Sequence, residues 1–241
     1  MFTRVCMSVG SATYTTGLYQ VPLDAARSMV PDDYFRVAEV FPDKAVFFIG
    51  TGEFRQCALG PYREMYLGFY TENREREEAA TLDSNLEEFS RNESRMYMWK
   101  NWVTTSAALD RMHVAGSTVF RRGEIDRHDE ATHTTFSMSH PEEGKIRFST
   151  PRASEHVASH QRMKRVHYGR LHGEPSRCTL DLDIDDMVTS PGQGSLELEG
   201  RVAEECAILG PLDQPLVAIW IGEMRFDMHK PLLLPTEPRP G

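Results

Sequence analysis

Apolar and polar residues alternate along much of this chain, and this period of two constrains the fold more than any other feature. The alternation is strict at residues 178–183 and 195–202, which predicts strands with one buried face. An apolar run at residues 216–226 predicts a long central strand. We expect further strands at residues 37–49 (split by a turn at 42–44), 62–70, 117–120, 132–138 and 145–149, with a hairpin turn at 141–144.

Helical patterns are few. They predict three short helices, at residues 22–29, 82–94 and 104–112. The first begins at Pro22 and is stopped by Pro31, and the third has Thr104 or Thr105 as its N-cap. Roughly ten strands and three helices predict one α+β domain, predominantly antiparallel, in which two packed sheets or a closed barrel protect the strand edges.

The composition is that of a globular chain with an acidic balance. Hydrophobic residues make up 40% of the 241 residues, enough for a substantial core. The 27 basic and 36 acidic residues give a net charge of -9, which argues against a nucleic-acid partner because such partners need a basic face. The apolar stretches at 45–49 and 216–221 are far shorter than the roughly 20 residues of a membrane span. We therefore expect a soluble cytoplasmic protein without a membrane partner.

Motifs for metals and nucleotides are missing from the sequence. The cysteines Cys6, Cys57, Cys178 and Cys206 show no zinc-ligand spacing, so we interpret them as reduced thiols. The sequence contains no GxGxxG, GxxxxGK[ST] or GxSxG motif. These absences favour a protein that uses neither a metal nor an organic cofactor.

Residues 156–172 are rich in histidine and in basic side chains. His156 and His160 stand four residues apart, as metal ligands on a helix often do, although the HExxH pattern is absent. Arg162, Lys164 and Arg165 follow closely. We interpret the segment as solvated and locally basic, with a metal site or an anion-binding patch as alternatives.

Two side chains are candidates for chemistry. Glu64 stands at the head of an otherwise apolar strand, where burial would raise its pKa and make it a general acid or base; alternatively, it pairs with Arg63 at the surface. Lys100 lies between Trp99 and Trp102, where a desolvated amine could attack a carbonyl carbon. The simpler interpretation of Lys100 is a side chain that extends its amine to water.

Three sequence blocks resemble the acetoacetate decarboxylase-like family. They are residues 21–31 (VPLDAARSMVP), residues 60–64 (GPYRE), and residues 210–216 (GPLDQPL) continuing through 232–235 (LLLP). Their order and spacing fit nearly the whole chain. The resemblance implies a cone-like barrel packed in a larger antiparallel sheet, and a homo-oligomer. Residues 71–96 then form an insertion, as a lid or an oligomer contact, and 235–241 an extended tail.

The resemblance also implies a site, which this chain matches in part. The family reaction decarboxylates a β-keto acid through a Schiff base on one lysine of a pair, with a pocket glutamate and an arginine near the N-terminus. Glu64 matches the glutamate. The residues that follow Asp110 at the end of the third predicted helix are Arg111, Met112, His113 and Val114, without a lysine. No arginine occurs at residues 11–13, and a second acidic position falls at Phe48 or Ile49.

We therefore expect a lyase-like or isomerase-like enzyme that acts on an enolisable carbonyl compound without the Schiff-base lysine. The substrate would be bulkier and less charged than acetoacetate. Glu64 would be the general acid or base, and His113 or Tyr62 would polarise the carbonyl group. The expected reactions are dehydration, isomerisation, cyclisation or cleavage of a carbon–carbon bond. Predicted substrate contacts are Phe48, Arg63, Met112 and Trp102.

Two other functions fit the same residues. In the first, Lys100 is displaced in sequence but replaces the missing lysine in space, which requires its amine to reach Glu64. In the second, the protein binds a small molecule and catalyses no reaction. This fits a pocket that keeps only one of the several catalytic positions of the family, the glutamate.

Overall fold

Strands form most of this fold. The computed structural model describes residues 4–235, except 31, 33, 77, 94, 115–119 and 154–155, and gives the backbone alone for 112–114 and 156–159. A large sheet contains β1 (Val5–Pro22), β2 (Lys44–Cys57), β3 (Tyr62–Thr71), β4 (Arg95–Val103), β5 (Phe120–Arg122), β9 (His156–Leu171), β10 (Glu174–Pro191), β12 (Val217–His229) and β13 (Leu232–Leu233). A smaller sheet contains β6 (Glu124–Asp129), β7 (His133–His140), β8 (Gly144–Pro151) and β11 (Ser195–Glu199).

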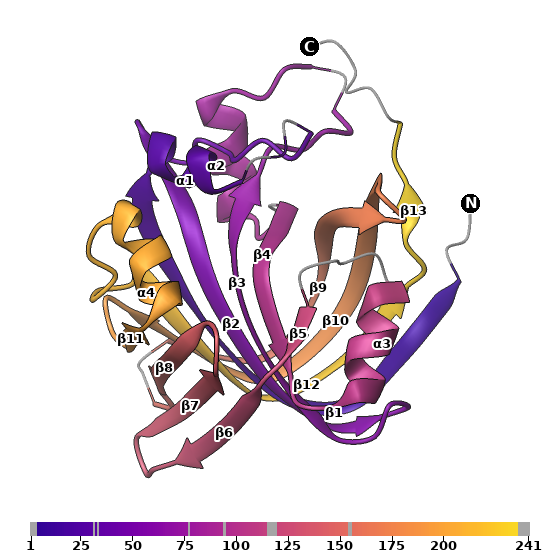
Figure 1. Ribbon diagram of the computed structural model, residues 1–241, viewed down its shortest axis with the longest axis vertical. Helices are drawn as coiled ribbons and strands as arrows, with labels where there is room; N and C mark the ends of the chain where they lie inside the picture. The colour runs from indigo at the N-terminus through magenta and orange to yellow at the C-terminus, as the bar shows by residue number, and fades with distance from the viewer. Residues whose placement is uncertain are drawn as a thin grey trace.

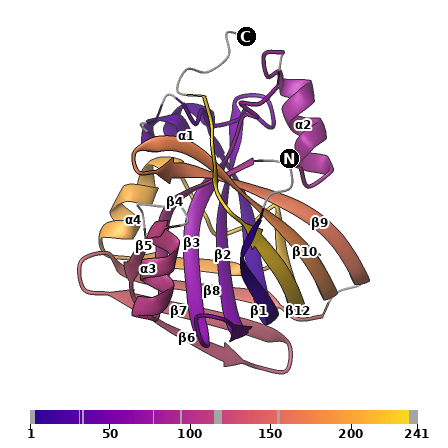
Figure 2. The same ribbon diagram turned by 90° about the vertical axis from the view of Figure 1, so that its right-hand side faces the viewer.

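The pairing in the large sheet returns to its first strand. The order runs β12, β1, β2, β3, β4, β9 and β10, and β10 pairs again with β12. These pairs are antiparallel except β4 with β9, and β5 joins β4 in parallel as well. Figures 1 and 2 show the strands curving around a shared interior, with the smaller sheet beside them. The α+β class with predominantly antiparallel strands is confirmed.

Strand β3 separates two hydrophobic cores. Tyr62 and Tyr66 point into the ring of strands, whereas Met65, Leu67 and Phe69 pack on the outside with residues of the smaller sheet. Successive side chains of a strand point to opposite faces, so a strand buried on both faces has few positions left for polar residues. This explains the nearly continuous apolar run in this part of the sequence.

A bulge in β4 changes which of its side chains face inward. Leu67 pairs with Lys100 and Gly68 pairs with Met98, so Trp99 is an extra residue on β4. Gly68 leaves room for the bulge, because a Cβ atom there would lie 2.2 Å from the carbonyl oxygen of Tyr97. The alternation of β4 therefore shifts by one residue at Trp99.

The helices are α1 (Leu23–Met29), α2 (Leu82–Ser90), α3 (Ser106–Val114) and α4 (Arg201–Cys206). The first three match the predicted helices within a few residues, and the Thr105 hydroxyl accepts a hydrogen bond from the Ala108 amide at 3.2 Å, as a helix cap does. None of the helices in the described part of the chain is long and apolar enough to cross a membrane.

Several predicted elements need correction. The strand predicted at 195–202 ends at Glu199, because Gly200 adopts a φ of 74° and turns the chain into α4. The first half of the run at 37–49 makes only isolated bridges at Val37 and Phe41 in place of a regular strand. Residues 117–119 and 236–241 lie outside the described residues. The sequence patterns did not predict β1, β4, β6 or β9.

Candidate functional site

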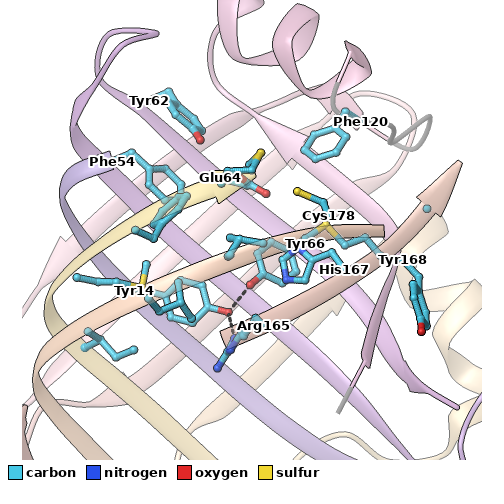
Figure 3. A pocket seen from close by; sticks show the side chains of 18 of the residues that line it. Tyr14, Phe54, Tyr62, Glu64, Tyr66, Phe120, Arg165, His167, Tyr168 and Cys178 are labelled. Carbon is cyan, nitrogen blue, oxygen red and sulfur yellow. Dashed lines mark hydrogen bonds between the residues drawn. The ribbon is translucent and has the colours of Figure 1, made fainter. Parts of the chain in front are cut away.

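A cavity of about 100 Å³ lies within the ring of strands. Figure 3 shows the side chains that enter it from β1, β3, β9 and the neighbouring strands. One wall is apolar and comes from β10 and β12; it consists of Leu180, Leu182, Ile184, Ile221, Met224, Phe226 and Met228. The polar groups of the cavity therefore gather on the remaining walls.

Glu64 is the acidic group of this cavity. Its position on β3 leaves it 5% exposed, and its Oε1 atom accepts a hydrogen bond from Nδ2 of Asn101 at 2.7 Å. Asn101 lies on the neighbouring strand β4, in register with Tyr66 of β3, and its side-chain amide therefore lies beside Glu64. Burial raises the pKa of Glu64 to about 7 and outweighs the hydrogen bond from Asn101, which lowers it. Glu64 can therefore gain or lose a proton near neutral pH.

Tyr62 lies two residues before Glu64 on the same face of β3. Its ring stacks on Phe54 with the centroids 4.6 Å apart, and its hydroxyl has no hydrogen-bond partner among the described residues. Burial, followed by the nearby charge of Glu64, raises the pKa of Tyr62 well above its usual range. Tyr62 therefore offers a neutral phenol with an unused donor inside the cavity.

A second polar group consists of Tyr14, Tyr66 and Arg165. The two tyrosine hydroxyls are hydrogen-bonded to each other, and Nη1 of Arg165 donates to the Tyr14 hydroxyl at 3.4 Å (Figure 3). Gly50 on β2 makes room for both rings: a Cβ atom there would lie 2.4 Å from Tyr66 and 2.6 Å from the Tyr14 hydroxyl. The arrangement therefore depends on a glycine in the middle of a strand.

His167 and Cys178 of the cavity are neutral near pH 7. Burial, followed by the charge of Arg165, lowers the pKa of His167 to about 3, and its Nε2 atom has no partner among the described residues. Burial also raises the pKa of the Cys178 thiol to about 12. Glu64 and Arg165 are thus the charged side chains among the described lining residues.

The predicted substrate contacts lie mostly outside this cavity. Phe48 packs behind Tyr66, with ring centroids 5.8 Å apart, and does not line the cavity. Arg63 and Trp102 lie on the outer face, where Nε of Arg63 is 2.8 Å from Oε1 of Glu53 and Trp102 is buried against the smaller sheet. The side chains of Met112 and His113 lie outside the described residues.

Lys100 does not reach Glu64. Its Nζ atom contacts Glu143 and lies 2.5 Å from Oε2 of Glu205, and it stands 4.8 Å from the ring centroid of Trp99 on the outer face. The reason is the bulge at Trp99, which turns Lys100 outward and the next residue, Asn101, inward. The hypothesis that Lys100 replaces the missing lysine is therefore wrong, and none of the described lining residues is a lysine.

The histidine-rich segment is strand β9 and divides its basic residues between two faces. Arg162 and Lys164 are exposed, whereas Arg165 and His167 line the cavity. The interpretation as a solvated segment is therefore wrong for its inward-facing half. On the exposed face, ligand atoms of His160, Asp183 and Asp185 lie within 4.8 Å of one another. The carboxylates there also face Arg162 and Arg225, so we interpret the cluster as an ion-pair network.

The sequence matches no protein-family model and no curated protein. Several solved structures share its fold. They include MppR, an enduracididine biosynthesis enzyme, with a TM-score of 0.65 and 13% identity over 97% of this chain and 90% of that chain. They also include an acetoacetate decarboxylase from Legionella pneumophila, with a TM-score of 0.65 and 10% identity over 95% of this chain and 87% of that chain. An acetoacetate decarboxylase-like enzyme from Sphingomonas wittichii also matches, with a TM-score of 0.58 and 13% identity over 97% of this chain and 95% of that chain. The chain therefore has the acetoacetate decarboxylase-like fold.

Proposed function

We propose that this protein is a small-molecule enzyme that acts on an enolisable carbonyl compound through Glu64, without a Schiff-base lysine. The observation that carries the proposal is a carboxyl group buried in a largely apolar cavity, with a pKa of about 7 and a single neutral hydrogen-bond donor. A general acid or base is most effective when its pKa lies near the working pH.

The proposed chemistry begins with proton transfer. Ionised Glu64 removes a proton from the carbon next to the carbonyl group, and the electron pair of that C–H bond moves to the carbonyl oxygen as an enolate. The hydroxyl of Tyr62, two residues before Glu64 on the same face of β3, has no partner among the described residues and donates a hydrogen bond to the carbonyl oxygen. The enolate then expels a β-hydroxyl group, which takes the proton from Glu64 and leaves as water; or it attacks a second carbonyl carbon of the same molecule, whose oxygen takes that proton; or it regains the proton at another carbon. These routes correspond to dehydration, cyclisation and isomerisation.

Enzymes of the same fold support this proposal in general terms. One solved structure of MppR holds pyruvate, and another holds the condensation product of pyruvate and imidazole 4-carboxaldehyde. Carbonyl compounds therefore occupy that protein. Whether His113 assists, whether the protein forms a homo-oligomer and whether it is cytoplasmic stay predictions from the sequence.

Proton exchange tests the proposal without knowledge of the natural substrate. We would incubate the protein in D₂O with a panel of ketones, esters and oxo acids and follow loss of the α-proton signals by NMR. Glu64→Gln should lower exchange by at least about 100-fold, as expected for loss of a general base. Glu223→Gln is the matched control, because Glu223 pairs with Arg55 away from the cavity lining. Unchanged exchange in Glu64→Gln would disprove the assigned role.

A binding protein without chemistry is the second candidate. It is favoured by the absence of a lysine from the described lining residues and by the largely apolar wall. Ligands that raise the melting temperature but show no α-proton exchange across the whole panel would favour this function over the first.

A further inference from the structure

We propose that Arg165, together with the hydroxyls of Tyr14 and Tyr66, forms an oxyanion-binding site inside the cavity. The site would take a ligand oxygen that carries negative charge. This oxygen is either a carboxylate that the ligand already has or the enolate oxygen that forms during the reaction. The inference deepens the proposed function and rests on it only for the enolate.

The first argument is that Arg165 lacks a counter-ion. Other arginines of β9 and β10 contact carboxylates at 2.7 Å, as Arg170 does with Asp32 and Arg177 with Glu75. Among the described residues, Arg165 has no carboxylate partner; it contacts the Tyr14 hydroxyl and lies 5.8 Å from the centroid of that ring. Arg165 is only partly exposed, so water satisfies its charge incompletely, and an anionic ligand would supply the missing partner.

The second argument is that the donors of this group are largely unused. A guanidinium carries five N–H donors in a planar fork, and the hydrogen bond described for Arg165 is a long one of 3.4 Å. The mutual hydrogen bond of Tyr14 and Tyr66 uses one of their two hydroxyl protons and leaves the other for a further acceptor. Nε2 of His167 is also unpaired and is a donor in the tautomer that carries the ring proton there. These donors surround one region of the cavity, as an oxyanion requires.

The third argument is position. Tyr66 follows Glu64 by two residues on the same face of β3, so their backbones are separated by roughly 7 Å along the strand. A small ligand can therefore place an oxygen near Tyr66 and a C–H bond near Glu64. Its apolar part would lie against β10 and β12. The expectation of a weakly charged substrate relied on the missing N-terminal arginine, and Arg165 enters the cavity from a different strand.

A phenol that ionises near neutral pH is a direct probe, because its colour reports its charge. We would titrate p-nitrophenol in the presence of the protein and read the phenolate absorbance. The wild-type protein should lower the pKa of the bound phenol by about one unit or more, which is a tenfold preference for the anion. Arg165→Met should abolish this shift, and Tyr66→Phe should reduce it. An unshifted pKa of the phenol bound to wild-type protein would overturn the proposal.

Two controls protect this experiment. Arg162→Met removes an exposed arginine from the outer face of the same strand and should leave the shift unchanged. Tyr66→Phe keeps the ring and its packing, so it tests the site even where Arg165→Met does not fold. Loss of the shift in Arg162→Met to the same degree would mean a general charge effect and would contradict a specific site.

Butanoate and butanamide distinguish the two sources of the oxyanion. Displacement of p-nitrophenol by butanoate at least tenfold more strongly than by butanamide would identify a carboxylate of the ligand. Displacement by butanoate that is no stronger than by butanamide, with the phenol shift intact, would mean that the site takes the delocalised oxygen of a phenolate but not a carboxylate, which favours the enolate oxygen. Either result supports the site.

The charge of Glu64 separates this proposal from the proposed function. The ionisable groups that interact with Arg165 are Tyr14 on β1, Tyr66 and Tyr70 on β3 and His167 on β9. Burial keeps Tyr66, Tyr70 and His167 neutral near pH 7, because it raises the pKa of both tyrosines and lowers the pKa of the histidine, and Glu64, which lines the same cavity, ionises there. Glu64→Gln should therefore keep the phenol shift and make phenolate binding independent of pH between 6 and 8. Proton exchange that depends on Glu64, combined with an unshifted phenol, would refute the oxyanion site alone.

Discussion

The two faces of the β3–β4 pair hold buried carboxyl groups in opposite ways. On the outer face, the side chain of Glu143 is fully buried and contacts two cations, Lys100 and Arg121. On the cavity face, Glu64 is almost as buried and receives a hydrogen bond from the neutral amide of Asn101. The two carboxyl groups are similarly buried but differ in their partners. Cations stabilise the charged form of a buried carboxyl group, whereas a single neutral amide does so only weakly.

The same contrast holds for the basic groups. Lys100 connects the turn between β7 and β8 to α4 through Glu143 and Glu205, so it helps to hold the smaller sheet against the larger one. Arg165 lies on the inner side without a carboxylate partner among the described residues. The outer charges stabilise the fold, and the inner charges cost stability that a ligand can recover.

The largest effect should come from breaking the outer ion pairs. Lys100→Met should lower the free energy of unfolding by about 3 kcal/mol, because it leaves the buried Glu143 with a single cation. Urea unfolding measures the change, and Lys145→Met, at an exposed pair with Glu199, is the control. Lys100→Met should keep the wild-type rate of α-proton exchange, because Lys100 lies outside the cavity. A stability loss below about 0.5 kcal/mol would mean that the outer charges are no better supported than the inner ones.

Glu64→Gln should change the free energy of unfolding in the opposite direction, because it should stabilise the protein. The folded pKa of about 7 lies above the unfolded value of 4.5, so the folded state disfavours ionised Glu64. The stability that protonated Glu64 contributes to the wild-type protein is fully present below pH 4.5 and is lost as the pH rises through 7. Glu64→Gln should therefore be more stable than wild type by up to about 3 kcal/mol at pH 8 and equal to it at pH 4. A variant that loses stability at pH 8 would contradict the raised pKa.

The rate of α-proton exchange should follow the ionisation of Glu64. It should rise with pH to a plateau above about pH 7, because the base is the ionised form, and fall about tenfold per unit below it. Asn101→Leu removes the donor that favours the charged form, so the midpoint of the profile should move to higher pH. A midpoint that stays in place would show that Asn101 does not set this pKa.

The smallest effect is expected from Arg63→Met. Arg63 pairs with Glu53 and donates to the carbonyl oxygen of Ile125 on the outer face, and its side chain is 35% exposed. Its loss should change the free energy of unfolding by about 1 kcal/mol and leave p-nitrophenol binding unchanged. Weaker binding would return Arg63 to the substrate contacts predicted from the sequence.

The sequence predicted the class of fold and the position of Glu64, because both depend on local patterns. Glu64 and Tyr62 begin an apolar strand, so their burial could be inferred from their neighbours. Arg165 and His167 were missed because consecutive basic residues hide the period of two in β9. The contact between Tyr14 and Tyr66 joins strands 52 residues apart, and no local pattern indicates it.

Trp99 has a consequence for how lysine chemistry can arise on this scaffold. Met96 and Met98 face the interior, and uninterrupted alternation would place Lys100 on that side as well. The extra residue of the bulge gives the place beside Glu64 to Asn101. If the bulge were lost with every residue kept, Lys100 would pair with Tyr66 and turn inward while Asn101 turned outward, so an amine could enter or leave the reaction centre without any change of a lysine. The phase of one strand, as much as the identity of its residues, selects the chemistry available to this cavity.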